Sequence, residues 1–364
     1  MQGVKFLTRD KTKFFRTLNK RVNGYFKENN IEKTGNWRLY IKAIFMFALL
    51  IVPLVLILTL RDSMPVWAQI LSMITIGIGM AGVGMNVMHD ANHESFSSKK
   101  WVNKLMGSSI YILAGNDYNW KVQHNVLHHT YTNIQGLDED IDAGRIIRFS
   151  KHAKWLKIHK FQKYYSIFLY GLLTINWAIT TDFKQSYHYL KRHLSYGKFP
   201  NPATQWTKLI IGKILYYALW IVLPLSLGFA WYQVLIGFFI MHYTAGIILS
   251  VTFQLAHVMP NTEMPLPDKD GNMNHTWAIH QLFTTSNFAP KNKFIEFFTG
   301  GLNHQVEHHI FPHISHIHYK NISKIVHDTA KEFNLPYNEY KTFFTAFAEH
   351  IKQLNYLGTH PKIA

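Results

Sequence analysis

The sequence predicts an all-α integral membrane protein with four transmembrane helices in two hairpins and a helical cap on the cytoplasmic side. Three observations lead to this fold class. Two uncharged runs, residues 43–60 and 66–88, are separated by only five residues. A later run, residues 214–262, contains 49 residues without Lys, Arg, Asp or Glu. Histidines gather beside the ends of these runs, on segments that are rich in Lys and Arg.

The lengths of the apolar runs set the number of spans. At 1.5 Å per residue, about 20 residues cross a hydrocarbon core about 30 Å thick. Residues 43–60 and 66–88 therefore predict one hairpin, and residues 214–262 are long enough for a second hairpin with its turn near Pro224 to Gly228. The expected spans are about 43–60, 66–88, 209–227 and 230–252.

The distribution of basic residues predicts the orientation. Residues 1–42 carry 11 Lys and Arg against 3 Asp and Glu, whereas the two short turns between spans share one basic residue. Cytoplasmic segments carry the excess of Lys and Arg, so both turns are expected outside the cytoplasm. A weaker uncharged run, residues 164–181, is expected to lie at the interface, because a fifth span would send half of the chain across the membrane.

The same pattern divides the chain into three parts. We expect a basic cytoplasmic segment at 1–42, a membrane domain at 43–330 and a cytoplasmic helix or tail at 331–364. The net charge of +17 indicates an anionic partner. Nucleic acid is disfavoured because no binding motif accompanies the charge. The absence of cysteine excludes disulfides, iron–sulfur clusters and thiolate zinc sites.

Twenty-two histidines are the outstanding feature of the composition, and eight of them form three clusters. The clusters are His89 and His93; His124, His128 and His129; and His304, His308 and His309. Residues i and i+4 share one face of an α-helix, so His89 can pair with His93 and His124 with His128 on a metal. His129 is then rotated by about 100° and can reach a second metal. Eight imidazoles suit two metal ions, and imidazole without thiolate suits Fe, Cu, Ni or Zn.

The triple pattern resembles the membrane fatty acid desaturases, whose signature is His-x3/4-His, His-x2/3-His-His and (His or Gln)-x2/3-His-His. Residues 120–133 resemble the second box with its flanks, and the acidic stretch 138–142 fits the same likeness. Residues 300–312 resemble the third box of the front-end, or linoleoyl-CoA-desaturase-like, branch. The resemblance covers roughly residues 40–330 and implies a di-metal site in the cytoplasmic cap.

The resemblance also implies which residues hold the metal. The expected iron ligands are His89, His93, His124, His128, His129, His308 and His309, with His304 or Gln305 at the first position of the third box. His257, just after the fourth span, is a further candidate. The polar residues expected to hydrogen-bond the ligand rings and fix their tautomers are Asp90, Asn92, Asn125, Gln254, Gln305 and Glu307.

The implied activity is O2-dependent desaturation of an acyl chain carried on CoA, a carrier protein or a lipid. An unactivated methylene has no acidic proton for a side chain to remove, so a metal must generate a stronger oxidant from O2. The resemblance implies that the metal is a pair of non-haem irons and that two electrons come from outside the chain. The chain has no His-Pro-Gly-Gly haem motif. A separate donor such as ferredoxin or cytochrome b5 is therefore expected.

A basic run offers a docking surface for an acidic donor or a phosphorylated carrier. Its members fall at every third position: Arg145, Arg148, Lys151, Lys154, Lys157, Lys160 and Lys163. On an α-helix this row would wind around the helix. The simpler interpretation of the run is a solvated helix, or one whose lysines reach lipid phosphates.

Two alternatives to desaturation remain from the sequence. A related di-iron hydroxylase, or an oxygenase that modifies sphingolipids or carotenoids, would carry the same boxes. A His-rich metal transporter belongs to a different class and would predict ionisable residues inside the spans. Among the histidines only His242 lies well inside a predicted span, and the others cluster at one end of the spans, which disfavours the transporter.

Overall fold

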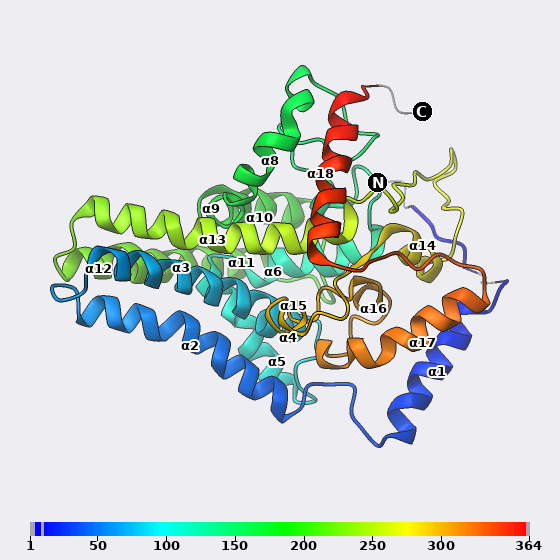
Figure 1. Ribbon diagram of the computed structural model, residues 1–364, viewed down its shortest axis with the longest axis horizontal. Coiled ribbons are helices and arrows are strands. Elements are labelled where there is room, and N and C mark those ends of the chain that lie inside the picture. Colours follow the sequence, from blue (N-terminus) through cyan, green and yellow to red (C-terminus); the bar gives the residue numbers. More distant parts are fainter. Residues whose placement is uncertain (1–3, 9–10, 362–364) are drawn as a thin grey trace. The chain divides into compact units, whose positions relative to one another are not determined.

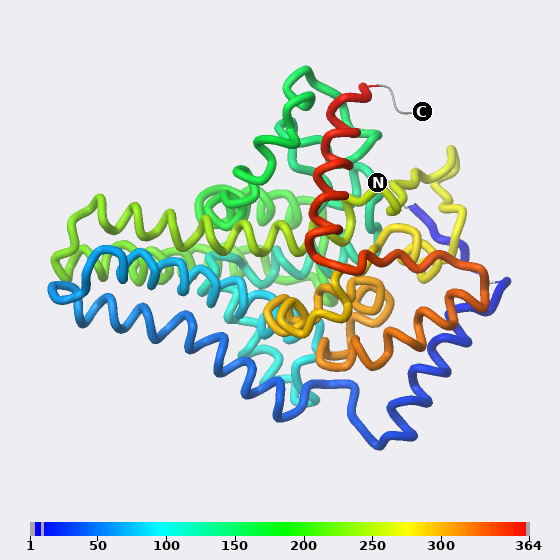
Figure 2. Tube along the Cα trace, viewed as in Figure 1, coloured from blue at the N-terminus to red at the C-terminus, as the bar shows by residue number. Residues whose placement is uncertain are grey.

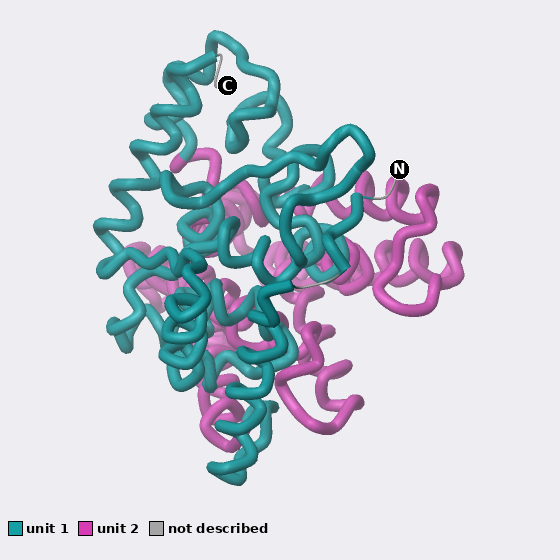
Figure 3. Tube along the Cα trace, turned by 90° about the vertical axis from the view of Figure 1, so that its right-hand side faces the viewer, with its two compact units in different colours: residues 1–35, 123–166, 252–364 teal, residues 36–122, 167–251 magenta. Residues whose placement is uncertain are grey.

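The computed structural model describes residues 4–8 and 11–361, and its ribbon is almost entirely helical (Figure 1). The uncertain residues are grey in the tube of Figure 2. The chain divides into two compact units, which are coloured separately in Figure 3. Unit 1 contains Met1–Gly35, Gln123–Ser166 and Thr252–Ala364, and unit 2 contains Asn36–Val122 and Ile167–Val251. The sequence-based division at residues 42 and 330 stays a prediction.

Unit 2 is built from helices alone among its described residues. They are α2 (Trp37–Thr59), α3 (Val66–Val83), η1 (Gly84–Met88), α4 (His89–Asn92), α5 (Lys100–Gly107), η2 (Ser108–Leu113), α6 (Asp117–Trp120), α9 (Leu173–Asn176), η6 (Trp177–Thr181), α10 (Asp182–Lys191), α11 (Pro202–Tyr217), η7 (Ala218–Val222) and α12 (Leu223–Ser226). Three further helices continue from one unit into the other: η3 (Lys121–His128), α8 (Gln162–Tyr170) and α13 (Trp231–His257).

Unit 1 combines helices with one short parallel strand pair. Its elements are α1 (Phe14–Glu28), α7 (His129–Tyr131), η4 (Glu139–Ile141), η5 (Lys157–Phe161), α14 (Trp277–Thr284), β1 (Asn287–Phe288), α15 (Lys293–Phe298), α16 (Gln305–Ile310), η8 (His316–His318), α17 (Tyr319–Glu332), β2 (Glu339–Tyr340) and α18 (Phe343–Thr359). In the strand pair, Asn287 lies opposite Glu339.

Four helices in the described part of the chain are long and apolar enough to cross a membrane, as the sequence predicted. They are Trp37–Thr59, Val66–Asn92, Pro202–Ser226 and Trp231–His257. The third begins earlier than expected, because the side chain of Asn201 accepts a hydrogen bond from the backbone N–H of Thr204 and Pro202 occupies the first turn. Residues 164–181 are not among the four; they fall into α8, α9 and η6.

The segment 167–181 is fastened to the candidate span α13 of unit 2 by small residues and hydrogen bonds. A Cβ atom on Gly246 of α13 would lie 2.5 Å from the carbonyl oxygen of Gly171, so only glycine permits this approach. The Ser250 hydroxyl donates to the carbonyl of Tyr170, and the Thr174 hydroxyl donates to the carbonyl of His242. These contacts hold the segment 167–181 against α13.

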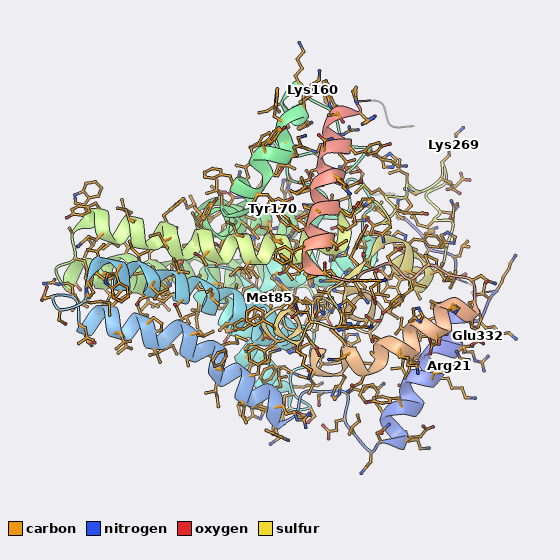
Figure 4. The ribbon with its side chains drawn as sticks, in the orientation of Figure 1. Arg21, Met85, Lys160, Tyr170, Lys269 and Glu332 are labelled. Atoms are coloured by element: carbon orange, nitrogen blue, oxygen red, sulfur yellow. The ribbon has the colours of Figure 1, made fainter. Side chains whose placement is uncertain are left out.

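The core of unit 1 forms where α1 meets α14 and α17. Phe14, Leu18, Val22 and Phe26 recur every four residues and so line one face of α1. They pack in one buried cluster with residues of α14, α16 and α17: Ile279, Leu282, Val306, Ile310, Tyr319, Ile322, Val326 and Ala330. At the rim, Arg21 and Glu332 form an exposed ion pair at 2.7 Å (Figure 4). Because Val306 and Ile310 belong to this cluster, it supports the helix of the third histidine box.

The structure corrects the expectations for the basic run 145–163. Residues 145–156 form turns and extended segments, and a helix begins only at Lys157. Arg148 is buried, and its guanidinium donates to the carbonyls of Leu357 and His360 at the end of α18, at 2.8 and 2.9 Å. Arg148 is therefore a clamp on the C-terminal helix and is not available for docking.

The helix α18 also carries a buried histidine that makes its stability depend on pH. The Nδ1 atom of His350 lies 2.9 Å from the carbonyl oxygen of Val258. Burial lowers the pKa of His350 to about 4. An unfolded histidine titrates near 6.5, so between these values the unfolded chain binds more protons. The stabilisation is complete above about pH 6.5 and is lost as the pH falls toward 4.

We expect His350→Gln to flatten this part of the pH dependence, by up to about 3 kcal/mol at pH 4. The measurement is thermal unfolding of the detergent-solubilised protein between pH 7 and 4. The exposed His327 gives the matched control, His327→Gln, which should behave as the wild type does. Identical pH profiles for the two variants would contradict the assignment.

Candidate metal centre

The second histidine box adopts a winding that differs from the α-helix assumed from the sequence. Residues 121–128 form the π-helix η3, in which backbone hydrogen bonds join residues five apart. His124 and His129 are five apart, and their Nε2 atoms lie 3.2 Å from each other. The rings of His124 and His128 still stack, with centroids 5.3 Å apart, as the spacing predicted. The π-helix thus directs all three imidazoles of the box to one place.

Three histidines from three separate helices form a close group in unit 1. His128 of η3, His257 at the end of α13 and His309 of α16 each offer a ring nitrogen, and these atoms lie within 4.8 Å of one another. All three residues are buried. The Nε2 atoms of His257 and His309 have no hydrogen-bond partner among the described residues. Buried nitrogens of this kind normally have a partner, and a metal ion fits this donor set.

The opposite ring nitrogens of these histidines are held by hydrogen bonds. The Nδ1 atom of His128 lies 3.1 Å from both carboxylate oxygens of Asp138, and Nδ1 of His309 lies 2.9 Å from Oε1 of Gln281. Nδ1 of His257 is 3.3 Å from the carbonyl oxygen of Thr284. Metal-binding histidines typically donate their second N–H in this way, which fixes the tautomer and leaves Nε2 for the metal.

His308 and His129 complete the cluster within unit 1. Nδ1 of His308 lies 3.0 Å from the hydroxyl of Tyr319, and its ring centroid is 4.6 Å from that of His129. The rings of His129 and His309 are 4.5 Å apart. The structure therefore brings together His257 and every histidine of the second box with the two adjacent histidines of the third.

Two carboxylates control the charge of this cluster. Burial lowers the pKa of His128, but the negative charges of Asp138 and Asp140 outweigh that effect and raise it to about 9. Burial, reinforced by the neighbouring imidazoles, drives the pKa of His309 well below its ordinary value. With their pKa values both raised, His128 and Asp138 hold a proton between them near neutral pH, and a metal ion bound at the His128 ring would displace it.

The third box separates its two candidates for the first position. Gln305 lies on α16, three and four residues before His308 and His309, and so shares a helix face with them. His304 precedes the helix, with Nδ1 3.8 Å from the carboxylate of Glu307. Within the described chain, His304 belongs to none of the close metal-binding groups.

Glu307 lies near His304, but its hydrogen bonds go to residues that are not histidines. Its carboxylate accepts hydrogen bonds from Asn287 at 2.8 Å and from the Tyr337 hydroxyl at 2.9 Å. Burial raises the pKa of Glu307 to about 7. These bonds tie α16 to β1 and to the segment before β2, so Glu307 holds the helix of the third box in place.

The first box lies in unit 2, where η1 leads into α4. His89 and His93 are both buried, and their ring centroids are 4.7 Å apart, as their spacing predicted. The ring of Trp120 meets both imidazoles edge to face, at 5.7 and 5.6 Å. Asp90 has a carboxylate oxygen 4.0 Å from Nδ1 of His89.

The remaining polar candidates lie close to the boxes. Asn92 donates to the carbonyl of Gly107, and Gln254 donates to the carbonyl of Asp140. Asn125 lies half-buried on η3. The ring partners Gln281 and Tyr319 were missed, because nothing in the sequence links them to a box. Asp138 had a signal, since it lies in the acidic stretch that supported the family resemblance.

Replacing Asp138 with Asn tests the ring orientation. The variant keeps the volume but removes the charge that holds the His128 ring, so metal affinity should fall about 10- to 100-fold. Isothermal titration of the metal-free protein with Fe2+ under anaerobic conditions measures it. Asp142→Asn changes an exposed residue of the same acidic stretch and should bind as the wild type does. Equal affinities for the two variants would rule out the orienting role.

Comparison with known proteins agrees with this geometry. Residues 65–341 match the family model described as fatty acid desaturase. The sn-1 linoleoyl-lipid 6-desaturase of Arthrospira platensis is 34% identical over 96% of this chain and 94% of its own length. The protein of the same name from Synechocystis sp. is 35% identical over 98% of both chains. An acyl-lipid (8-3)-desaturase of Mortierella alpina is 32% identical over 96% of this chain and 79% of its own length.

These matches confirm the resemblance that the three boxes carried. The family model covers the first, second and third boxes together with the candidate spans between them. The histidine cluster of unit 1 adds buried groups that are able to hold a metal ion. The chain belongs to the fatty acid desaturase family and is an oxidoreductase of acyl chains.

Proposed function

We propose that this protein is a membrane-bound acyl-lipid desaturase that forms a double bond at position 6 of an acyl chain, using O2 and two electrons from a separate donor. The observation that supports it best is the buried group of His128, His257 and His309, whose ring nitrogens converge within 4.8 Å. The two relatives named sn-1 linoleoyl-lipid 6-desaturase match nearly the whole chain, and they suggest the lipid carrier and the position.

The proposed cofactor is a pair of non-haem iron ions. The proposed ligands are His89, His93, His124, His128, His129, His257, His308 and His309, with Gln305 in preference to His304 beside them. For His89 and His93 the proposal takes its support from the sequence signature. When bound, the irons would supply the redox chemistry that reduces O2 and oxidises an unactivated methylene.

The residues of the chain prepare the site for that chemistry. Asp138, Gln281 and Tyr319 hold the Nδ1 atoms of three imidazoles, so their Nε2 lone pairs are available to metal. His128 gives up its proton when metal binds, and Asp138 and Asp140 then balance the charge of the metal. Burial of the cluster excludes water from the reacting centre.

The direct test is expression in a host with simple lipids, followed by mass spectrometry of the fatty acid methyl esters. We expect a new double bond at position 6 and about two irons per purified chain. His128→Ala should abolish the product while membrane insertion stays normal, and His327→Ala, at an exposed site, should leave the product unchanged. A hydroxylated product, or full activity of His128→Ala, would contradict the proposal.

We further propose that both short turns between spans lie outside the cytoplasm and that the histidine boxes lie inside it. The support is the scarcity of Lys and Arg in these turns. Tags inserted after Asp62 and near Gly228 should react with an impermeant reagent in intact cells. Tags at Lys20 and Lys160 should react only after lysis. Labelling of Lys160 in intact cells would show that residues 164–181 cross the membrane.

The proposed docking surface for an acidic donor or carrier consists of Arg145, Lys151, Lys154, Lys157, Lys160 and Lys163. Arg145, Lys154, Lys157 and Lys160 are exposed, and Lys160 points outward in Figure 4. Attraction between exposed charges is screened beyond about 8 Å at physiological salt. Turnover with a soluble ferredoxin should therefore fall as salt rises, chiefly through a higher apparent KM for the donor.

Reversal of Lys151, Lys154 and Lys157 to Glu should raise that KM about tenfold and leave the iron content unchanged. The control is the reversal of three exposed lysines elsewhere in unit 1, Lys291, Lys324 and Lys331. If both triple variants match the wild type at every salt concentration, the donor docks at another surface.

A further inference from the structure

A lysine inside a membrane-spanning helix serves no purpose in the mechanism described so far. Lys213 lies on α11, within the candidate span Pro202–Ser226, and is 6% exposed. Its ammonium donates to the carbonyl of Ala114 at 2.6 Å, to the carbonyl of Trp177 at 2.7 Å and to the carboxylate of Asp182 at 2.8 Å. An ammonium has three donors, so all of them are satisfied. Ionisable residues inside spans are costly and generally functional.

The three acceptors belong to segments that build one aromatic wall. Ala114 ends η2, and its left-handed backbone turns the chain after Ile110 and Tyr111. Trp177 is itself part of the wall. The wall is a cluster of buried Met88, Ile110 and Trp120 with Tyr111 and Trp177 packed against it. Lys213 therefore fixes the segment that carries Ile110 and Tyr111 and the segment that carries Trp177.

The third acceptor, Asp182, is connected to Trp120 through Asn119. The Nδ2 atom of Asn119 donates to the carbonyl of Asp182 at 2.8 Å and to its carboxylate at 3.2 Å. The hydroxyl of Ser186 donates to Oδ1 of Asn119 at 3.0 Å. Asn119 immediately precedes Trp120, so the ion pair between Lys213 and Asp182 sets the backbone position of that tryptophan.

Trp120 connects the wall to the first histidine box. Its ring stands edge to face against His89 and His93, with interplanar angles of 80° and 76°. Aromatic rings favour this geometry, and it restricts the rotation of both imidazoles. The direction of an imidazole lone pair follows the ring, so a shift of Trp120 changes how the first box can bind metal.

We propose that Lys213 is a positioning residue for the first histidine box, acting through Asp182 and Asn119 on Trp120. The ammonium draws three separate chain segments to one point and so fixes the wall that orients His89 and His93. This rests on the proposed function only in assigning those two histidines to iron. Lys213 touches no reacting group.

Two variants separate this role from simple support of the fold. Lys213→Met/Asp182→Asn removes both charges and so avoids leaving one buried charge unpaired. Asn119→Ala keeps the ion pair and cuts its link to Trp120. Lys208→Met is the control, since Lys208 is an exposed lysine five residues earlier on α11.

The readout is quenching of tryptophan fluorescence when Co2+ is added to the metal-free protein. The part of the quenching that comes from Trp120, called the Trp120 share, is the quenching of the protein minus the quenching of its Trp120→Phe variant. We expect both test variants to lose roughly half of this share or more, and desaturation to fall about tenfold, while membrane insertion stays normal. The control should match the wild type in both measurements.

The proposal is overturned if Asn119→Ala keeps the full Trp120 share and full turnover. That variant decides the question alone if the charge-neutral double variant does not fold. If the wild type forms no double bond in any lipid, the desaturase proposal fails, but the Co2+ titration still decides whether Lys213 positions the first box.

Discussion

A buried imidazole needs a partner on each of its two nitrogens, and this requirement organises the metal-binding part of unit 1. Four of the rings place Nδ1 against a carboxylate, a backbone carbonyl, a hydroxyl or an amide; they are His128, His257, His308 and His309. That choice leaves the Nε2 atoms of His257 and His309 directed to a common centre. These partners include Asp138 just before η4, Gln281 on α14 and Tyr319 on α17. Elements distant in sequence must therefore fold together before the site exists.

Unit 2 meets the same requirement with a different set of groups. In water a lysine or a histidine needs no fixed partner, but on helices apolar enough to cross a membrane, such as α11 and α13, each donor needs one in the protein. Lys213 uses two carbonyls and a carboxylate, and His242 lies between the hydroxyls of Thr174 and Tyr216. Both networks fasten the segment 167–182 to α11 and α13. A charge-free stretch could not be held at one register so firmly, because apolar packing alone is not directional.

The sequence predicts those elements whose pattern lies within one short stretch of the chain. Uncharged length predicts the four spans, and the i and i+4 spacing predicts the pairing of His89 with His93. The signals fail where a contact depends on distant chain. No sequence pattern around Gln281 or Tyr319 marks these residues as hydrogen-bond partners of His309 and His308. In the sequence Arg148 looks like one more exposed cation of the basic run. It is buried because its guanidinium binds the carbonyl groups at the end of α18, which lies far away in the sequence. The π-helical winding of η3 was also hidden, since its residue types favour no winding in particular.

That winding has a consequence for how the second box can vary. In an α-helix the number of intervening residues alone decides which side chains share a face. Where a helix can shift between α and π turns, a one-residue insertion is absorbed as a local bulge and the flanking side chains keep their direction. Nε2 of His129 meets Nε2 of His124 across such a turn. A signature written with either two or three intervening residues then describes one constellation of nitrogens, reached by two windings of the backbone.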